Sequence, residues 1–125
     1  MILDTNALSA FADEDPGLLT ILHRSRQVSL PVIVLGEYRA GITQSRHRSR
    51  YEAWLESFLA DCTVLDISEE TTRHYVTVVL DLKRMGKPIP VNDLWIAALC
   101  RQYLLPVVTR DRHFDVVPNL QRLGW

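Results

Sequence analysis

The sequence predicts an α/β fold in which a mainly parallel sheet lies between two layers of helices. Short apolar runs typical of strands alternate along the chain with longer segments of helical periodicity. Signals for helix starts and stops separate many of these segments, and 47% of the residues are hydrophobic. Parallel strands joined by right-handed crossovers form a three-layer α/β/α sandwich. With 125 residues, the chain is expected to fold as a single domain over residues 1–125.

Three strands are expected in the first half of the chain, at residues 1–3, 28–30 and 63–67. Two helices are expected between the first strand and the second. Asp15 followed by Pro16 is a typical helix start, because the acid can cap the helix and proline fits its first position.

Two more helices are expected between the second and third strands. The first begins at Pro31 and places Val34, Leu35, Tyr38 and Ile42 on its apolar side. The basic segment 46–50 follows as a loop or a helix start. Beyond it, apolar residues share one face at helical spacing, which predicts the second helix. That face consists of Tyr51, Trp54, Leu55, Phe58 and Leu59.

The second half of the chain continues the alternation. Ser68, followed by two acids, predicts a helix start, and Gly86 predicts its end. Another helix is expected to begin at Asn92 or Asp93. The remaining expected strands are residues 106–109 and an edge strand at residues 120–123. The expected order is therefore β-α-α-β-α-α-β-α-α-β-β.

Charge and cysteine content exclude several classes of protein. With 14 basic and 15 acidic residues the net charge is −1, which argues against binding nucleic acid through bulk charge. Two cysteines, Cys62 and Cys100, are too few for a disulfide scaffold and match no metal-ligand spacing. The sequence contains neither an apolar run of about 18–20 residues nor a charged leader, so we expect a cytoplasmic protein without a membrane span.

Four acids occupy positions that matter in a parallel sheet. Asp4 ends the first strand, and Asp111 closely follows the fourth. Asp93 lies in the first turn of a helix, and Glu37 is expected to border the apolar face of another. Each acid alone has an ordinary structural explanation as a helix cap, a turn residue or an exposed helix residue. Ligands bind beyond the carboxyl ends of parallel strands, and we expect the four acids to meet there.

Such a cluster favours a divalent cation. Two unit charges about 4 Å apart repel by roughly 4 kcal/mol at an effective dielectric constant near 20, and a bound cation reverses that energy. Hard oxygen ligands select Mg²⁺ or Mn²⁺ over metals that prefer thiolates. A site of this kind can polarise a phosphoryl oxygen and activate a water molecule, which cleaves phosphodiesters without a covalent intermediate.

Two other functions remain open from the residues alone. The first is a phosphatase in which Asp4 attacks phosphorus, although Asn6 stands where such an enzyme would place a second acid. A covalent phosphate on Asp4 would support that alternative. The second is a binding module that keeps the fold without catalysis, and the presence of all four acids argues against it.

Four ordered segments carry a family resemblance. The sequences "LDTNAL", "PVIVLGEYRAG", "VNDLWIAA" and "VVTRDRHFDVVPNL" resemble the PIN-domain family, and more narrowly the VapC toxins of toxin–antitoxin modules. The resemblance covers the whole chain. It implies an α/β/α sandwich and a Mg²⁺- or Mn²⁺-dependent ribonuclease that leaves a 3′-hydroxyl and a 5′-phosphate. It also implies a small antitoxin that covers the acidic groove, and homodimers are common in the family.

The resemblance assigns roles to individual residues. Asp4, Glu37, Asp93 and Asp111 match the family's four acids and are expected to act in catalysis and to bind the metal. Asn6 and Thr109 match polar residues that would orient carboxylates or waters. Asp115 is an additional acid near the cluster, either around the metal or in a loop. The residues themselves, apart from the resemblance, suggest RNA contacts at Arg46, Arg48, Arg110 and Arg112, with His113 beside the last acid; the alternative is an exposed surface without RNA. Tyr38 and Trp95 are candidates to stack on bases, and Trp95 is equally a candidate for the core or a dimer interface.

Overall fold

The computed structural model describes residues 1–125 and contains a five-stranded parallel sheet in the order β3-β2-β1-β4-β5. The sheet confirms the predicted fold class and the position of the last strand at an edge. Its strands are β1 (Ile2–Leu3), β2 (Ser29–Pro31), β3 (Thr63–Leu65), β4 (Val107–Val108) and β5 (Arg122–Leu123).

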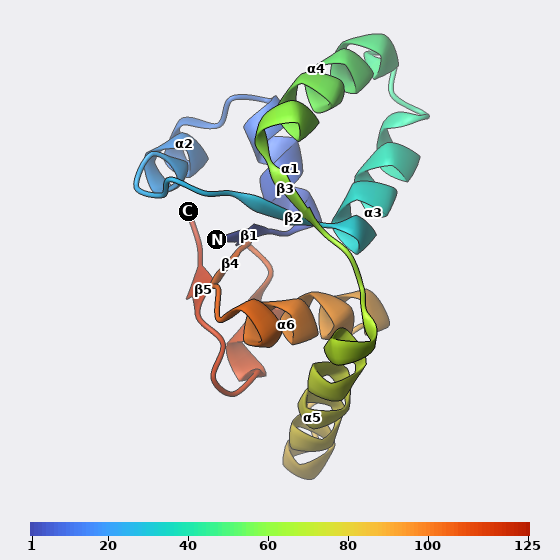
Figure 1. Ribbon diagram of the computed structural model, residues 1–125. Helices are drawn as coiled ribbons and strands as arrows, with labels where there is room; N and C mark the ends of the chain where they lie inside the picture. The colour runs from blue at the N-terminus through green and yellow to red at the C-terminus, as the bar shows by residue number, and fades with distance from the viewer.

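Helices cover both faces of the sheet. One layer contains α1 (Thr5–Ala12), α2 (Pro16–Leu22), α3 (Val32–Ile42) and α4 (Arg48–Asp61). The other contains α5 (Glu69–Met85) and α6 (Val91–Tyr103), with the short 3₁₀ helix η1 (Arg112–Val116) beside α6. Figure 1 shows the two layers on opposite sides of the strands, with the two chain ends close together. Two helices lie in each of the first three crossovers, as the sequence predicts.

Several helix boundaries follow from the capping residues that the sequence predicts. The Asp15 side chain accepts hydrogen bonds from the N–H groups of Gly17 and Leu18 at the start of α2. Ser68 caps α5. Gly86 ends α5 with φ of 64°, a left-handed conformation that glycine adopts without a steric penalty.

Other boundaries differ from the predictions. Helix α6 begins at Val91, earlier than the expected start at Asn92 or Asp93, because Pro90 holds the extended conformation that precedes a helix. The third strand ends at Leu65, two residues before the expected end. Helix η1 was not predicted; it begins where the Asp111 side chain accepts a hydrogen bond from the His113 N–H.

The centre of the sheet fixes the position of the site. Ile2 and Leu3 of β1 pair with Val107 and Val108 of β4, and all four side chains are fully buried between the helix layers. From β1 the chain continues to β2 on one side, whereas from β4 it continues to β5 on the other. Open α/β sheets bind ligands at such a point of divergence, and we call the region beyond the carboxyl ends of β1 and β4 the crevice. None of the helices has the length and apolar character needed to span a bilayer.

Candidate functional site

Asp4 forms the buried floor of the crevice. It follows β1 directly, caps α1 and is only 5% exposed. Its Oδ1 accepts a hydrogen bond from the Thr5 N–H at 2.7 Å, and its Oδ2 accepts from Thr109 Oγ1 at 2.8 Å and Asn6 Nδ2 at 3.1 Å. Burial raises the pKa of Asp4, although the hydrogen bonds oppose that shift. Both carboxylate oxygens are therefore held in a fixed orientation.

Thr109 and Asn6 connect the end of β4 to Asp4. Thr109 Oγ1 accepts hydrogen bonds from Asn6 Nδ2 and from the Asp111 N–H, each at 2.9 Å. Asn6 Oδ1 accepts one from the Arg110 N–H at 3.0 Å. Both residues thus contact the first acid of the predicted set, and their roles in orienting it stay predictions.

Asp93 and Asp111 meet at the opening of the crevice, together with His113. The Nδ1 atom of His113 lies 3.2 Å from Asp93 Oδ2 and 3.1 Å from Asp111 Oδ2. Each of the three residues offers one possible ligand atom, and these atoms lie within 4.8 Å of one another. The sequence placed His113 beside Asp111 but gave no signal for its contact with Asp93, which lies 20 residues earlier.

The electrostatics of the crevice reflect this crowding. Burial, reinforced by the charges of Asp4 and Asp111, raises the pKa of Asp93 to about 6, while His113 acts in the opposite direction. An ordinary aspartate has a pKa of 3.8. The carboxylates therefore destabilise one another's charged forms, and a cation between them would reverse that effect.

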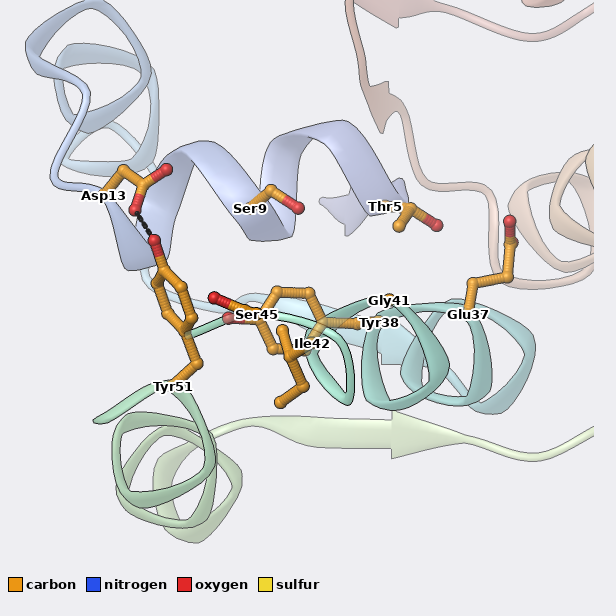
Figure 2. Close-up of a pocket in the computed structure, with 9 residues that line it drawn as sticks. All are labelled: Thr5, Ser9, Asp13, Glu37, Tyr38, Gly41, Ile42, Ser45 and Tyr51. Atoms are coloured by element: carbon orange, nitrogen blue, oxygen red, sulfur yellow. Dashed lines mark hydrogen bonds between the residues drawn. The ribbon is translucent and has the colours of Figure 1, made fainter. Parts of the chain in front are cut away.

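Glu37 is not among the residues whose possible ligand atoms lie within 4.8 Å of one another. It is exposed on α3 and makes no hydrogen bond or ion pair, so it does not border the buried face as expected. The core-facing positions of α3 are Val34, Tyr38 and Ile42, which repeat every four residues and lie on the predicted apolar side. Figure 2 shows Glu37 and Thr5 at one end of a cavity of about 330 Å³, and Glu37 faces that cavity.

The remainder of the cavity lies between α1, α3 and the start of α4 (Figure 2). At its far end the Tyr51 hydroxyl donates a hydrogen bond to Asp13 at 2.7 Å. The hydroxyl oxygens of Thr5 and Tyr38 are buried and have no hydrogen-bond partner. Burial raises the pKa of Tyr38 to about 12. Because Tyr38 is only 3% exposed, its ring is not available to stack on RNA bases as expected.

Sequence comparison identifies the family. The family model for the PIN domain matches residues 1–120. The chain belongs to the PIN-domain family. Ribonuclease VapC2 of Haemophilus influenzae is 31% identical over 129 residues, covering 99% of this PIN domain and 96% of that protein. Ribonuclease VapC2 of Rickettsia felis is 28% identical, with the same coverage of both chains.

Solved structures of similar proteins share the fold of this PIN domain. A crystal structure of DNA-bound VapBC from Salmonella typhimurium matches with a TM-score of 0.86 and 25% identity, covering 99% of this chain and 96% of that chain. A crystal structure of VapBC2 from Rickettsia felis, bound to a DNA fragment from their promoter, gives a TM-score of 0.85 and 26% identity. It covers 99% of this chain and 97% of that chain.

Asp115 of the PIN domain faces an arginine. Its carboxylate accepts two hydrogen bonds from Arg122, at 2.5 and 3.2 Å, and this pairing lowers the pKa of Asp115. Arg122 also donates a hydrogen bond to the Thr109 carbonyl oxygen at 3.2 Å. Asp115 is thus linked to the site through Arg122, a residue that the sequence analysis missed. A basic residue in the last strand was the only signal in the sequence.

The four predicted RNA-binding arginines of the PIN domain have different surroundings. Arg110 forms an ion pair with Asp15 at 2.8 Å and lies over the Trp125 ring. Arg48 pairs with Glu52 at 2.7 Å. Arg46 and Arg112 are exposed and make no side-chain hydrogen bond. The latter two are therefore freest to bind phosphate, whereas Arg110 and Arg48 would have to exchange existing partners.

Trp95 also has a partner within the PIN domain. Its ring stacks on that of Tyr75, with centroids 4.0 Å apart and an interplanar angle of 23°. This stack joins α6 to α5, the two helices that cover one face of the sheet. The contact favours a packing role for Trp95 over stacking on RNA.

Proposed function

We propose that this PIN domain is an endoribonuclease toxin that hydrolyses phosphodiester bonds in RNA and is neutralised by a cognate antitoxin. The observation that carries the proposal is the convergence of Asp93 and Asp111 on one point beside Asp4, in the crevice where β1 and β4 diverge. The likeness over nearly the whole chain to proteins named ribonuclease VapC supports the same activity.

The donor atoms of the site fit Mg²⁺ or Mn²⁺. Asp93 and Asp111 each aim one carboxylate oxygen at the same position, and Asp4 adds negative charge behind them. Asp4, Asp93 and Asp111 would hold the ion, and Glu37 is the fourth expected ligand. When bound, such an ion polarises a phosphoryl oxygen and lowers the pKa of a water molecule.

The chain's own residues orient the reacting groups. Thr5, Asn6 and Thr109 keep the Asp4 carboxylate in one orientation, so it need not reorganise during the reaction. Arg112, next to Asp111 and free of partners, is placed to bind an RNA phosphate, and Arg46 would extend that contact along the strand.

The phosphatase alternative finds no support in the surroundings of Asp4. A nucleophilic carboxylate needs an accessible oxygen, whereas Asp4 is 5% exposed and both its oxygens accept hydrogen bonds. Asp93 and Asp111 are more exposed than Asp4, with side chains 13% and 33% exposed, and they lie in positions suited to a cation.

The proposal extends to partners and location. The solved VapBC relatives support an antitoxin as the protein partner. We also propose a homodimer, since α5 exposes Val76 and Leu80 one turn apart and Val91 begins the neighbouring helix. Sedimentation of the purified chain tests that assembly.

We further propose that residues 1–125 form a single domain and that the protein is located in the cytoplasm. One apolar core of 22 buried residues supports the single domain.

Cleavage of RNA by the purified chain tests the activity. We expect Mg²⁺ or Mn²⁺ to support internal cleavage, EDTA to abolish it, and the products to carry 5′-phosphates. Coexpression with a cognate antitoxin should suppress cleavage. A phosphate covalently bound to Asp4, or RNA left intact with either metal, would contradict the proposal.

A further inference from the structure

We propose that His113 is a ligand of the divalent cation together with Asp93 and Asp111. The site is then a mixed nitrogen–oxygen site that favours Mn²⁺ over Mg²⁺. This inference rests on the proposed metal dependence and assigns a role to a residue outside the four expected acids.

The first support is the spacing of the three donor atoms. Nδ1 of His113 lies 3.2 Å from Asp93 Oδ2 and 3.1 Å from Asp111 Oδ2. Neighbouring ligands at about 2.1 Å from an octahedral ion lie roughly 3.0 Å apart. The nitrogen therefore already lies at the separation that neighbouring ligands adopt from each of the two oxygens, and all three ligand atoms lie within 4.8 Å of one another.

The second support is the hydrogen inventory of the imidazole. Nδ1 carries at most one hydrogen, and that hydrogen can point well at only one of the two carboxylate oxygens. The two oxygens come from different elements, Asp93 from α6 and Asp111 from the start of η1. A cation in their midst would attract both oxygens and the imidazole lone pair together.

The third support is the way the backbone positions the ring. The His113 N–H donates to Asp111 Oδ1 at 2.9 Å, which leaves Asp111 Oδ2 to face the ring. Phe114, the next residue, is fully buried and anchors η1 against the core. The opposite ring nitrogen, Nε2, makes no hydrogen bond, so the ring could rotate slightly without breaking another contact.

The identity of the donor predicts the metal preference. Mg²⁺ is bound almost entirely by oxygen ligands, whereas transition metals accept imidazole nitrogen more readily. Removing His113 should therefore weaken Mn²⁺ binding by about tenfold or more while changing Mg²⁺ binding by less than about threefold. Asp in place of His supplies an oxygen donor and should shift the preference toward Mg²⁺.

Pulsed electron paramagnetic resonance of Mn²⁺ bound to the full chain tests the inference directly. The wild type should show coupling between the manganese electron spin and an imidazole nitrogen, and His113→Ala and His113→Asp should lose it. Calorimetric titration of each variant with Mn²⁺ and with Mg²⁺ gives the affinity ratios. The matched control is His74→Ala, because His74 lies 4.0 Å from a single carboxylate, Glu70, on α5.

Absence of nitrogen coupling in the wild type, or an Mn²⁺/Mg²⁺ preference that His113→Ala leaves unchanged, would overturn the assignment. Either result would mean that His113 only pairs with the carboxylates and moves aside for the ion. Melting curves of the metal-free variants show whether each is folded. RNA cleavage separates the two proposals: cleavage without nitrogen coupling overturns only the ligand assignment, whereas coupling without cleavage supports the assignment and contradicts the proposed ribonuclease.

Discussion

Two acid-rich regions meet at the carboxyl end of β4 and place their carboxylates in opposite environments. The aspartate cluster, formed by Asp4, Asp93 and Asp111, brings carboxylates together, and the pKa values of Asp4 and Asp93 are raised. The arginine-paired acids, Asp15 and Asp115, each lie within 2.8 Å of a guanidinium nitrogen, and their pKa values are lowered. One region therefore opposes the charged form of its acids and the other favours it.

The causes of these pKa shifts indicate different roles for the arginine-paired acids and the aspartate cluster. The hydrogen bond from the Leu18 N–H is the largest cause for Asp15, with Arg110 adding to it, and Arg122 is the main cause for Asp115. Those contacts stabilise the folded chain around the site. Burial and mutual repulsion raise the pKa values in the aspartate cluster. This arrangement is expected of carboxylates that bind a cation.

The largest expected effect comes from removing one charge of the aspartate cluster. Asp93→Asn should reduce RNA cleavage by about 100-fold or more, because a metal ligand is lost. The metal-free variant should melt no lower than the wild type, since repulsion decreases. The matched control is Asp15→Asn, which makes the same change among the arginine-paired acids, keeps an oxygen that can cap α2, and should retain cleavage. Wild-type cleavage by Asp93→Asn would refute the role of Asp93.

Next in size is the effect of the metal on stability. A ligand that binds only the folded chain should stabilise it by roughly 2.7 kcal/mol at about 100 times its Kd. We expect Mn²⁺ to raise the Tm of the wild type in this way and to have much less effect on Asp93→Asn. Differential scanning calorimetry across a Mn²⁺ titration measures both. A Tm that does not respond to Mn²⁺ would contradict the proposal that the aspartate cluster binds a cation.

The pH dependence of the metal-free chain should reveal the aspartate cluster. Because the pKa of Asp93 is raised from 3.8 to about 6, the folded state binds more protons than the unfolded state between those values. The free energy of unfolding should therefore gain a contribution from Asp93 that falls as pH rises through this interval. Urea unfolding in EDTA measures it, and Asp93→Asn should flatten that contribution.

The arginine-paired acids should show the opposite dependence. Their lowered pKa values add stability above the ordinary aspartate range, and that stability is lost as pH falls through the folded-state pKa. Asp15→Asn should weaken the loss on acidification. Each substitution changes how the free energy of unfolding depends on pH. If Asp93→Asn and Asp15→Asn change that dependence in the same direction, the two groups of acids do not differ as proposed.

The smallest expected effect is on Arg122. Arg122→Lys keeps the charge but cannot bind both oxygens of Asp115 and the Thr109 carbonyl at once. We expect a modest decrease in Tm and a loss of cleavage of less than about tenfold, well below that of Asp93→Asn. Thermal melting and initial cleavage rates check this ranking. An Arg122→Lys loss equal to that of Asp93→Asn would mean that the arginine belongs to the site itself.

Much of the fold follows from local sequence. Strand-like runs, helix caps at Asp15 and Ser68 and the stop at Gly86 are signals within a few residues, and the structure has them where expected. That Asp4 and Thr109 lie close together is also predictable, because adjacent parallel strands end at one edge of the sheet. These features depend on periodicity and topology rather than on details of packing.

Other features depend on orientations that periodicity does not define. Periodicity predicts the apolar side of α3, but the exact rotation of the helix about its axis decides that Glu37, beside the buried Tyr38, is exposed. The contact of His113 with Asp93 depends on η1, a single short helix within a polar segment that reads as a loop. The link from Arg122 to Thr109 depends on the register of a two-residue edge strand. Each of these is set by tertiary contacts between distant residues.

The hydroxyl of Thr109 is both a donor and an acceptor of hydrogen bonds in the crevice. Its one hydrogen has the shorter contact with Asp4 Oδ2, at 2.8 Å against 3.3 Å to Asn6 Oδ1, and its lone pairs receive hydrogens from Asn6 Nδ2 and the Asp111 N–H. Serine could reproduce all three contacts, whereas valine, though equal in shape, could reproduce none. A protonated Asp4 could donate to Thr109 only by expelling one of the present donors. The hydrogen bonds to Asp4 thus favour its charged form, although burial still leaves the pKa of this carboxyl raised.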